Sequence, residues 1–182
     1  MAKIHLVRHG QAAAGFGAHA DPGLSELGIE QARSVAQRLV EAGPLVIISS
    51  PLARAYETAQ PLAELWGCEI QIEHRVAEIP SPTQNLTERA AWLSQAMEGS
   101  WGELPNEQIQ WRAALGECLH ALYEDCVVFS HYVAINAAVG LAQEDDRMRI
   151  FGPDNCSVTT LDNTAGRLNV LSLGNTATTK IN

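Results

Sequence analysis

Residues 3–10 read KIHLVRHG, an apolar and β-branched run that ends on an arginine, a histidine and a glycine. Two further runs, LVIIS at 45–49 and CVVFS at 126–130, are equally apolar and also end beside polar residues. Near-continuous apolar strands are typical of a parallel sheet that is covered on both faces. Because ligands bind beyond the carboxyl ends of such strands, the three strand ends predict the place of a functional site.

Helical patterns separate these strands and predict helices on both faces of the sheet. A fourth, short strand is expected at 69–72, and two β-rich segments around 163–166 suggest a closing hairpin. Ser50 is a candidate cap for a helix with Pro51 at its first position. The predicted fold is α/β, a three-layer α/β/α arrangement with a mainly parallel sheet, as one domain over 1–182. The predicted helices span 25–42, 51–66, 87–98, 106–124 and 132–142.

Charge and composition limit the classes of partner. The chain has 182 residues, 46% of them hydrophobic, and a formal net charge of −9. A chain this acidic is not expected to bind nucleic acid or an anionic membrane. The start, MAKIHLVRHG, lacks the apolar run of a secretory signal, and no stretch is long enough to cross a bilayer. We therefore expect a cytoplasmic protein.

Two arginines and two histidines follow the strand ends. Arg8 and His9 follow the first strand, Arg54 lies soon after the second, and His131 follows the strand at 126–130. Arginine offers a planar set of donors that suits phosphate oxygens. The helices after two of these strands would also point free N–H groups at the same place. The pattern predicts an anion site, with phosphate as the best candidate.

The motifs LVRHG at 6–10, SSPLARAYETA at 49–59, a later isolated glutamate, and SH at 130–131 occur in this order. Together they resemble the histidine phosphatase superfamily, also called phosphoglycerate mutase-like. The resemblance runs from about residue 3 to residue 161, which is most of the chain. RHG alone would be a weak signal, whereas the longer second motif in the right context makes the combination specific.

The resemblance implies a role for each motif residue. His9 would be the nucleophile that forms a phosphohistidine, with its other ring nitrogen bonded to a backbone carbonyl. Arg8, Arg54 and His131 would bind the phosphoryl oxygens and stabilise charge in the transition state, His131 best when protonated. Glu78 is the candidate general acid and base. No metal and no other cofactor is implied.

Other choices for the acid, and three departures from the family pattern, remain open. Glu73 and Glu88 are neighbours that could serve instead of Glu78. Many family members carry asparagine at the position of Gly15, glycine at that of Tyr132 and arginine at that of Asn136. These differences affect substrate preference and phosphate binding and remove none of the four core groups.

The resemblance implies a phosphatase that acts on a small phosphorylated molecule. The segment of about thirty residues at 73–105 is a modest lid, which would leave the pocket open to water. His19, in the loop after the first strand, could touch substrate, and Trp92 and Trp101 lie in the lid segment. The alternatives are a phosphoglycerate mutase-type phosphotransferase, a protein phosphohistidine phosphatase, and a non-catalytic phosphate-binding domain. The oligomeric state is left open.

Overall fold

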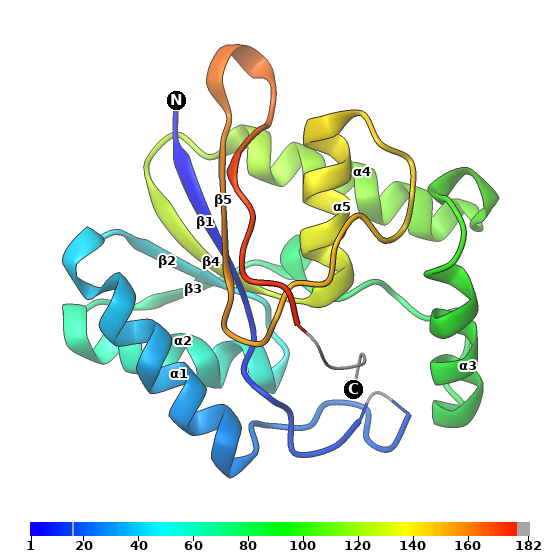
Figure 1. Ribbon diagram of the computed structural model, residues 1–182, viewed down its shortest axis with the longest axis horizontal. Coiled ribbons are helices and arrows are strands. Elements are labelled where there is room, and N and C mark those ends of the chain that lie inside the picture. Colours follow the sequence, from blue (N-terminus) through cyan, green and yellow to red (C-terminus); the bar gives the residue numbers. More distant parts are fainter. Residues whose placement is uncertain (16, 178–182) are drawn as a thin grey trace.

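A computed structural model describes residues 1–15 and 17–177, and one sheet organises the described chain. The strand order is β3-β2-β4-β1-β5-β6 (Figure 1). The first four strands are parallel to one another, and β5 and β6 form an antiparallel hairpin beside β1. The strands are β1 (Lys3–Arg8), β2 (Val46–Ser49), β3 (Ile70–Ile72), β4 (Cys126–Ser130), β5 (Val158–Asp162) and β6 (Asn169–Ser172). The mainly parallel sheet and the closing hairpin confirm the sequence-based predictions.

Helices cover both faces of the sheet, as the sequence predicts, and complete the three layers. Helices α1 and α2 pack on one face and α4 and α5 on the other, whereas α3 stands beside the sheet (Figure 1). No described helix has both the length and the hydropathy needed to cross a bilayer. The helices are α1 (Glu26–Leu39), α2 (Ala53–Trp66), α3 (Leu86–Ala96), α4 (Asn106–Ala121) and α5 (Tyr132–Gln143), with short 3-10 turns at Val40–Ala42, His74–Val76, Trp101–Glu103 and Thr164–Gly166.

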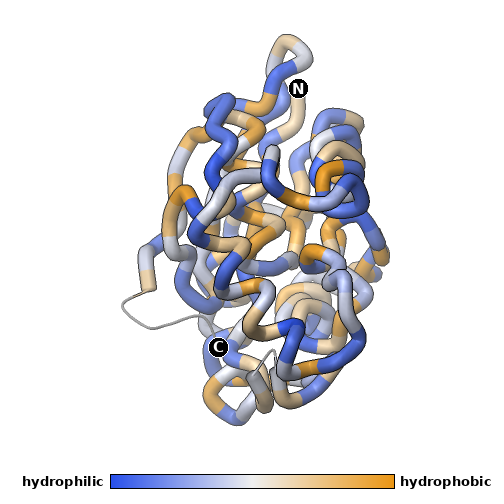
Figure 2. Tube along the Cα trace, turned by 90° about the vertical axis from the view of Figure 1, so that its right-hand side faces the viewer, coloured by the Kyte–Doolittle hydropathy of each residue, from blue (hydrophilic) through white to orange (hydrophobic). Residues whose placement is uncertain are grey.

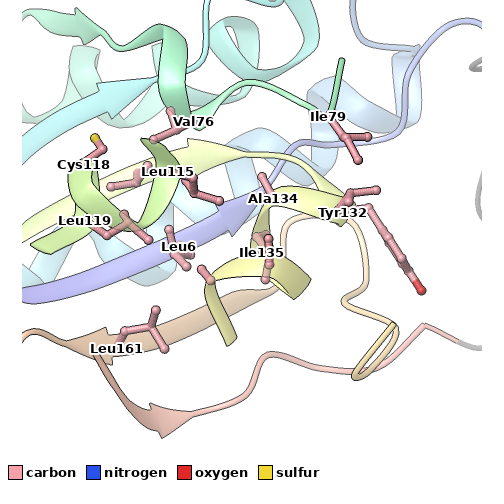
Figure 3. Close-up of a cluster of buried hydrophobic side chains, with 14 of the residues drawn as sticks. Leu6, Val76, Ile79, Leu115, Cys118, Leu119, Tyr132, Ala134, Ile135 and Leu161 are labelled. Atoms are coloured by element: carbon pink, nitrogen blue, oxygen red, sulfur yellow. The ribbon is translucent and has the colours of Figure 1, made fainter. Parts of the chain in front are cut away.

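The core is divided by the sheet into two apolar clusters. Along β1, Leu6 packs into the cluster under α4 and α5, whereas Val7 packs into the cluster under α1 and α2. This alternation follows from the period of two in a strand. Figure 3 shows the first cluster, in which Leu115 and Leu119 of α4 face Leu6 and Ile135. Figure 2 shows that orange, hydrophobic residues and blue, hydrophilic residues alternate along the chain.

Helix α2 begins at Ala53, so the prediction that Pro51 opens it is wrong by two residues. The physical reason is that the backbone of Leu52 is extended, with φ −70° and ψ 135°, so the helix begins only after this residue. The Ser50 hydroxyl accepts from the Leu52 N–H at 3.2 Å and contacts Nε2 of His131 at 2.8 Å. The carboxylate of Asp21 accepts from the Ala53 N–H at 2.9 Å instead. The late start places Arg54 at the second position of the helix, beside the strand end.

Candidate active site

The ends of β1, β2 and β4 meet at one edge of the sheet. Arg8 is paired in register with Ser130, and His9 and His131 follow these two residues directly. The rings of His9 and His131 lie with their centroids 5.2 Å apart. Arg54 reaches the same place from the first turn of α2. A pocket at this edge is lined by Arg8, His9, Arg54 and Glu78, together with Ala12, Ala14, His19, Ala20, Pro22, Leu93, Tyr132 and Val133.

Hydrogen bonds fix the tautomer of His9. Nδ1 lies 2.7 Å from the carbonyl oxygen of Gly10, which can only accept, so Nδ1 carries the proton. This confirms the predicted carbonyl partner. Nε2 is therefore unprotonated, and it accepts from Nε–H of Arg54 at 3.2 Å. Burial, followed by the charges of Arg54 and Arg8, holds the pKa of His9 well below its ordinary value. The ring is neutral and its free lone pair lies among cations.

The two arginines that line the pocket, Arg8 and Arg54, are buried. Arg8 is 5% exposed and donates from one terminal nitrogen to the Pro153 carbonyl at 2.8 Å. Arg54 is also 5% exposed and forms an ion pair with Asp21 at 3.8 Å. Burial lowers the pKa of both guanidinium groups. Because an arginine pKa starts so high, both remain charged and supply positive potential inside an acidic protein.

His131 is fully buried beside His9. Burial, and then Arg54, His9 and Arg8, hold its pKa well below the ordinary value. The ring is therefore neutral, whereas the expectation of a protonated His131 concerns the site with a phosphoryl group bound. Its Nε2 contacts the Ser50 hydroxyl, and its Nδ1 is buried with no partner among the described residues. A bound phosphate dianion would raise this pKa, since an opposite charge favours the protonated ring.

Glu78 lies at the N-terminus of α5. Its carboxylate accepts from the backbone N–H groups of Ile79 at 3.0 Å, Val133 at 3.2 Å and Ala134 at 3.3 Å. The helix N-terminus thus holds a carboxylate, and the prediction that its free N–H groups face the anion is wrong at these two positions. Burial raises the pKa of Glu78, although the backbone donors and Arg54 oppose the shift. A raised pKa keeps a proton available for transfer.

The two other candidate acids lie outside the pocket lining. Glu73 pairs with the Arg75 side chain at 2.6 Å, and these contacts lower its pKa to about 2. Glu88 accepts from the Thr83 hydroxyl at 2.9 Å near the start of α3. Neither glutamate lines the pocket, whereas Glu78 does. The structure therefore brings Glu78, and not its neighbours, to the histidines.

The three departures from the family pattern have different surroundings. A side chain at Gly15 would meet no atom within 4 Å. Asn136 is fully buried and its side-chain oxygen accepts from the Ile150 and Phe151 N–H groups at 2.8 and 3.0 Å. It holds the loop after α5 and does not line the pocket. Tyr132 lines the pocket, with its ring over the Arg8 guanidinium.

The two tryptophans of the predicted lid segment, Trp92 and Trp101, do not line the pocket. Trp101 is 2% exposed and stacks on Trp111 at 5.9 Å. Leu93 of α3 lines the pocket instead. His19 also lines it, as the sequence suggested, and its Nδ1 accepts from the Asp21 N–H.

Sequence reasoning missed two residues, Thr58 and Asn155, that bond the backbone around His9 and Arg54. The Thr58 hydroxyl accepts from the Gly10 N–H at 3.0 Å and donates to the Arg54 carbonyl at 2.6 Å. Asn155 donates to the His9 carbonyl at 2.9 Å. Thr58 lies within the SSPLARAYETA motif, which could have indicated it. Asn155 comes from a loop 146 positions away, and no local signal marks it.

The described residues hold no group of three or more histidine, cysteine or acidic side chains arranged to bind a metal ion. The positive charge at the pocket comes from the side chains of Arg8 and Arg54. The site therefore combines an unprotonated imidazole nitrogen, two guanidinium groups and a carboxyl group of raised pKa. Such a set can bind a phosphoryl group, attack it and protonate a leaving oxygen.

Comparison with known proteins decides the family. The model of the histidine phosphatase superfamily (branch 1) matches residues 4–176. The chain belongs to this superfamily. A histidine phosphatase relative, the probable phosphoglycerate mutase GpmB of Photorhabdus laumondii, is 31% identical over 186 residues, which cover 89% of this chain and 85% of that protein. The GpmB protein of Yersinia pestis is also 31% identical, over 188 residues covering 89% of this chain and 85% of that protein.

Two solved phosphatase structures have the same fold. The phosphoserine phosphatase of Entamoeba histolytica, solved with 3-phosphoglyceric acid, matches with a TM-score of 0.76 at 25% identity, over 97% of this chain and 98% of that chain. A mycobacterial glucosyl-3-phosphoglycerate phosphatase, solved with inorganic phosphate, matches with a TM-score of 0.76 at 23% identity, over 99% and 100% of the two chains. The second likeness shows the fold alone.

Proposed function

We propose that this histidine phosphatase hydrolyses small phosphate monoesters through a phosphohistidine on His9. The observation that carries the proposal is the tautomer of His9. Its proton on Nδ1 is bonded to the Gly10 carbonyl, so Nε2 keeps its lone pair inside a pocket lined by Arg8 and Arg54. A neutral imidazole nitrogen beside two guanidinium groups suits attack on a phosphorus atom whose oxygens are negative.

In the first step, Nε2 of His9 attacks phosphorus and the bond to the leaving oxygen breaks. The leaving oxygen takes a proton from Glu78, whose pKa burial raises. Arg8 and Arg54 bind the phosphoryl oxygens throughout the transfer. The products of the step are the phosphohistidine, a free alcohol and the carboxylate of Glu78.

In the second step, water attacks the phosphohistidine. Glu78, now a carboxylate, takes a proton from the water as its oxygen bonds to phosphorus. The bond between phosphorus and Nε2 breaks, and inorganic phosphate leaves. His9 is restored to its neutral tautomer and Glu78 to its protonated form, so the cycle is balanced. The Val133 and Ala134 N–H groups stabilise the carboxylate between the steps.

The lining of the pocket supports hydrolysis of small substrates. Around the charged groups lie small or apolar side chains, namely Ala12, Ala14, Ala20, Pro22, Leu93 and Val133. Of the described residues that line the pocket, one, Leu93, comes from α3. This limited cover favours entry of water after the leaving alcohol departs. The name of one structural relative, the phosphoserine phosphatase of Entamoeba histolytica, agrees with this choice.

A phosphoglycerate mutase is the second candidate, because relatives with 31% identity carry that name. A mutase returns the phosphoryl group to a second hydroxyl of the substrate instead of to water. The two activities share His9, Arg8 and Arg54, and they differ in the acceptor. Incubation with 3-phosphoglycerate separates them, because a mutase yields the isomer and a phosphatase yields glycerate and inorganic phosphate.

The test of the proposal is hydrolysis of p-nitrophenyl phosphate in EDTA by the wild type and by His9→Ala. We expect turnover by the wild type and loss of turnover in His9→Ala. Wild-type protein inert towards this ester and towards phosphoglycerates would contradict the proposal. Phosphate release from a phosphohistidine-bearing protein would then indicate a protein phosphohistidine phosphatase, and phosphate binding without release would indicate a binding domain.

A further inference from the structure

The Arg8 side chain is fixed by few hydrogen bonds for a buried cation. One terminal nitrogen donates to the Pro153 carbonyl at 2.8 Å. Nε is buried and has no hydrogen-bond partner among residues 1–15 and 17–177. The guanidinium carbon instead lies 5.2 Å from the centre of the Tyr132 ring. The face of this ring is therefore a principal contact that sets the plane of the guanidinium.

Tyr132 is itself held at both ends. Its backbone begins α5, directly after His131, and the residue is 6% exposed. In Figure 3 its ring extends away from the other labelled core residues, with the hydroxyl at the far end. The Arg149 side chain interacts electrostatically with the hydroxyl and pairs with Glu98 just beyond α3. The ring thus has a fixed orientation against Arg8.

We propose that Tyr132 is a positioning residue that holds the Arg8 guanidinium with its free N–H groups towards the bound phosphoryl group. The proposal rests on the proposed function, since it assigns Arg8 to phosphate binding. A desolvated cation over an aromatic face is attracted more strongly than an exposed one. A glycine, which many family members carry at this position, has no side chain that could make this contact. The contact between the Tyr132 ring and Arg8 therefore depends on the tyrosine of this chain.

If Tyr132 only fills space, the anion affinities of two variants should differ from those expected for a positioning role. Tyr132→Phe keeps the aromatic face and removes only the hydroxyl beside Arg149. Tyr132→Leu keeps an apolar side chain and removes the aromatic face. If the ring acts on Arg8 through its face, Phe retains most of the anion affinity and Leu does not. If Tyr132 only fills space, the two variants bind the anion alike.

The experiment is calorimetric titration with inorganic phosphate, which has no leaving group and so reports binding of the anion without turnover. We expect Tyr132→Phe to bind within about twofold of the wild type and Tyr132→Leu to bind about tenfold more weakly. In an Arg8→Gln background, Tyr132→Leu should add less than about twofold, because the cation is gone. Urea unfolding checks that each variant folds, and Tyr132→Met replaces Tyr132→Leu if that variant does not.

Equal affinities of the Phe and Leu variants, or an undiminished effect of Leu in the Arg8→Gln background, would overturn the proposal. The outcome is independent of turnover. A wild type that binds phosphate but hydrolyses no ester contradicts the proposed function and leaves the affinity comparison valid. A wild type that hydrolyses esters while the Phe and Leu variants bind alike contradicts only the role of Tyr132.

Discussion

Nε–H of Arg54 donates to Nε2 of His9 at 3.2 Å. The guanidinium therefore occupies the direction in which the imidazole lone pair points, and a phosphoryl group that bonds to Nε2 comes into contact with Arg54 as it does so. Burial first, and then the charge of this arginine, lower the pKa of His9. Under the proposed function, Arg54 helps to keep Nε2 unprotonated before the reaction and binds the phosphoryl oxygens during it.

Replacement of Arg54 tests both of these proposed roles, the effect on the pKa of His9 and the binding of phosphoryl oxygens. We expect Arg54→Ala to lower kcat/KM for p-nitrophenyl phosphate by about 10²–10³, the range for loss of one transition-state donor. The pKa of His9, followed by NMR, should rise, because a neighbouring cation is removed. Arg33→Ala, on the exposed side of α1, is the matched control and should leave both quantities unchanged. Near-native turnover of Arg54→Ala would remove Arg54 from the site.

The role of Glu78 is tested by the leaving group. An alkoxide needs a proton as it departs, whereas p-nitrophenolate is stable without one. Glu78→Gln should therefore lose about 10²–10⁴ in kcat for an alkyl phosphate and distinctly less for p-nitrophenyl phosphate. Wild-type kcat should fall as pH rises through the raised pKa of Glu78, if leaving-group protonation limits the rate. Glu88→Gln is the control, and equal losses for both esters in Glu78→Gln would exclude the general-acid role.

The two buried histidines predict how stability depends on pH. Their folded pKa values lie well below the unfolded value of about 6.5, so below that pH the unfolded chain binds protons that the folded chain does not. Their contribution to the free energy of unfolding is fully present above about pH 6.5, and it is lost as the pH falls towards the pKa values of the folded state. Each ring adds up to about 1.4 kcal/mol per pH unit to the slope of the unfolding free energy.

We therefore expect a shallower slope for His131→Asn than for the wild type between about pH 5 and 6.5, measured by urea unfolding. The exposed His120 offers the control, and His120→Asn should keep the wild-type slope. If His131→Asn also keeps it, the ring of His131 is not neutral in the folded protein.

Asn136 provides a test of how the loop after α5 is held. Its side-chain oxygen is the hydrogen-bond partner of the Ile150 and Phe151 N–H groups. Asn136→Ala should lower the free energy of unfolding by about 2–4 kcal/mol, because it leaves these two donors without a partner. Asn169→Ala, at an exposed position of β6, should change it by less than about 0.5 kcal/mol in the same urea titration. Equal losses in the two variants would contradict this role of Asn136.

The layers of the fold and the meeting of the strand ends could be predicted, because both follow from local patterns. Apolar runs such as CVVFS at 126–130 mark buried strands, and the rule for parallel sheets places their carboxyl ends together. The start of α2 could not be predicted from Ser50 and Pro51 alone. The hydroxyl of Ser50 has a long-range partner, His131, which no local capping rule takes into account.

The protonation states of the site residues were harder to predict from the sequence than the fold. The sequence shows that Glu78 precedes the strand at 126–130 by almost fifty residues, and it does not show that the carboxylate meets the N–H groups of Val133 and Ala134. Likewise, the neutral state of His131 follows from its burial among Arg54, His9 and Arg8, which is a property of the folded pocket. Long-range contacts therefore decide protonation states that residue types alone leave open.

The central claim is that His9 carries the phosphoryl group during turnover. The most direct measurement is rapid mixing of wild-type protein with p-nitrophenyl phosphate, followed by an alkaline quench and mass spectrometric mapping of the phosphoryl group. We expect a burst of p-nitrophenolate equivalent to the enzyme and a phosphoryl group on His9, both absent in His9→Ala. Sustained turnover by His9→Ala, or a phosphoryl group on another residue, would contradict the claim.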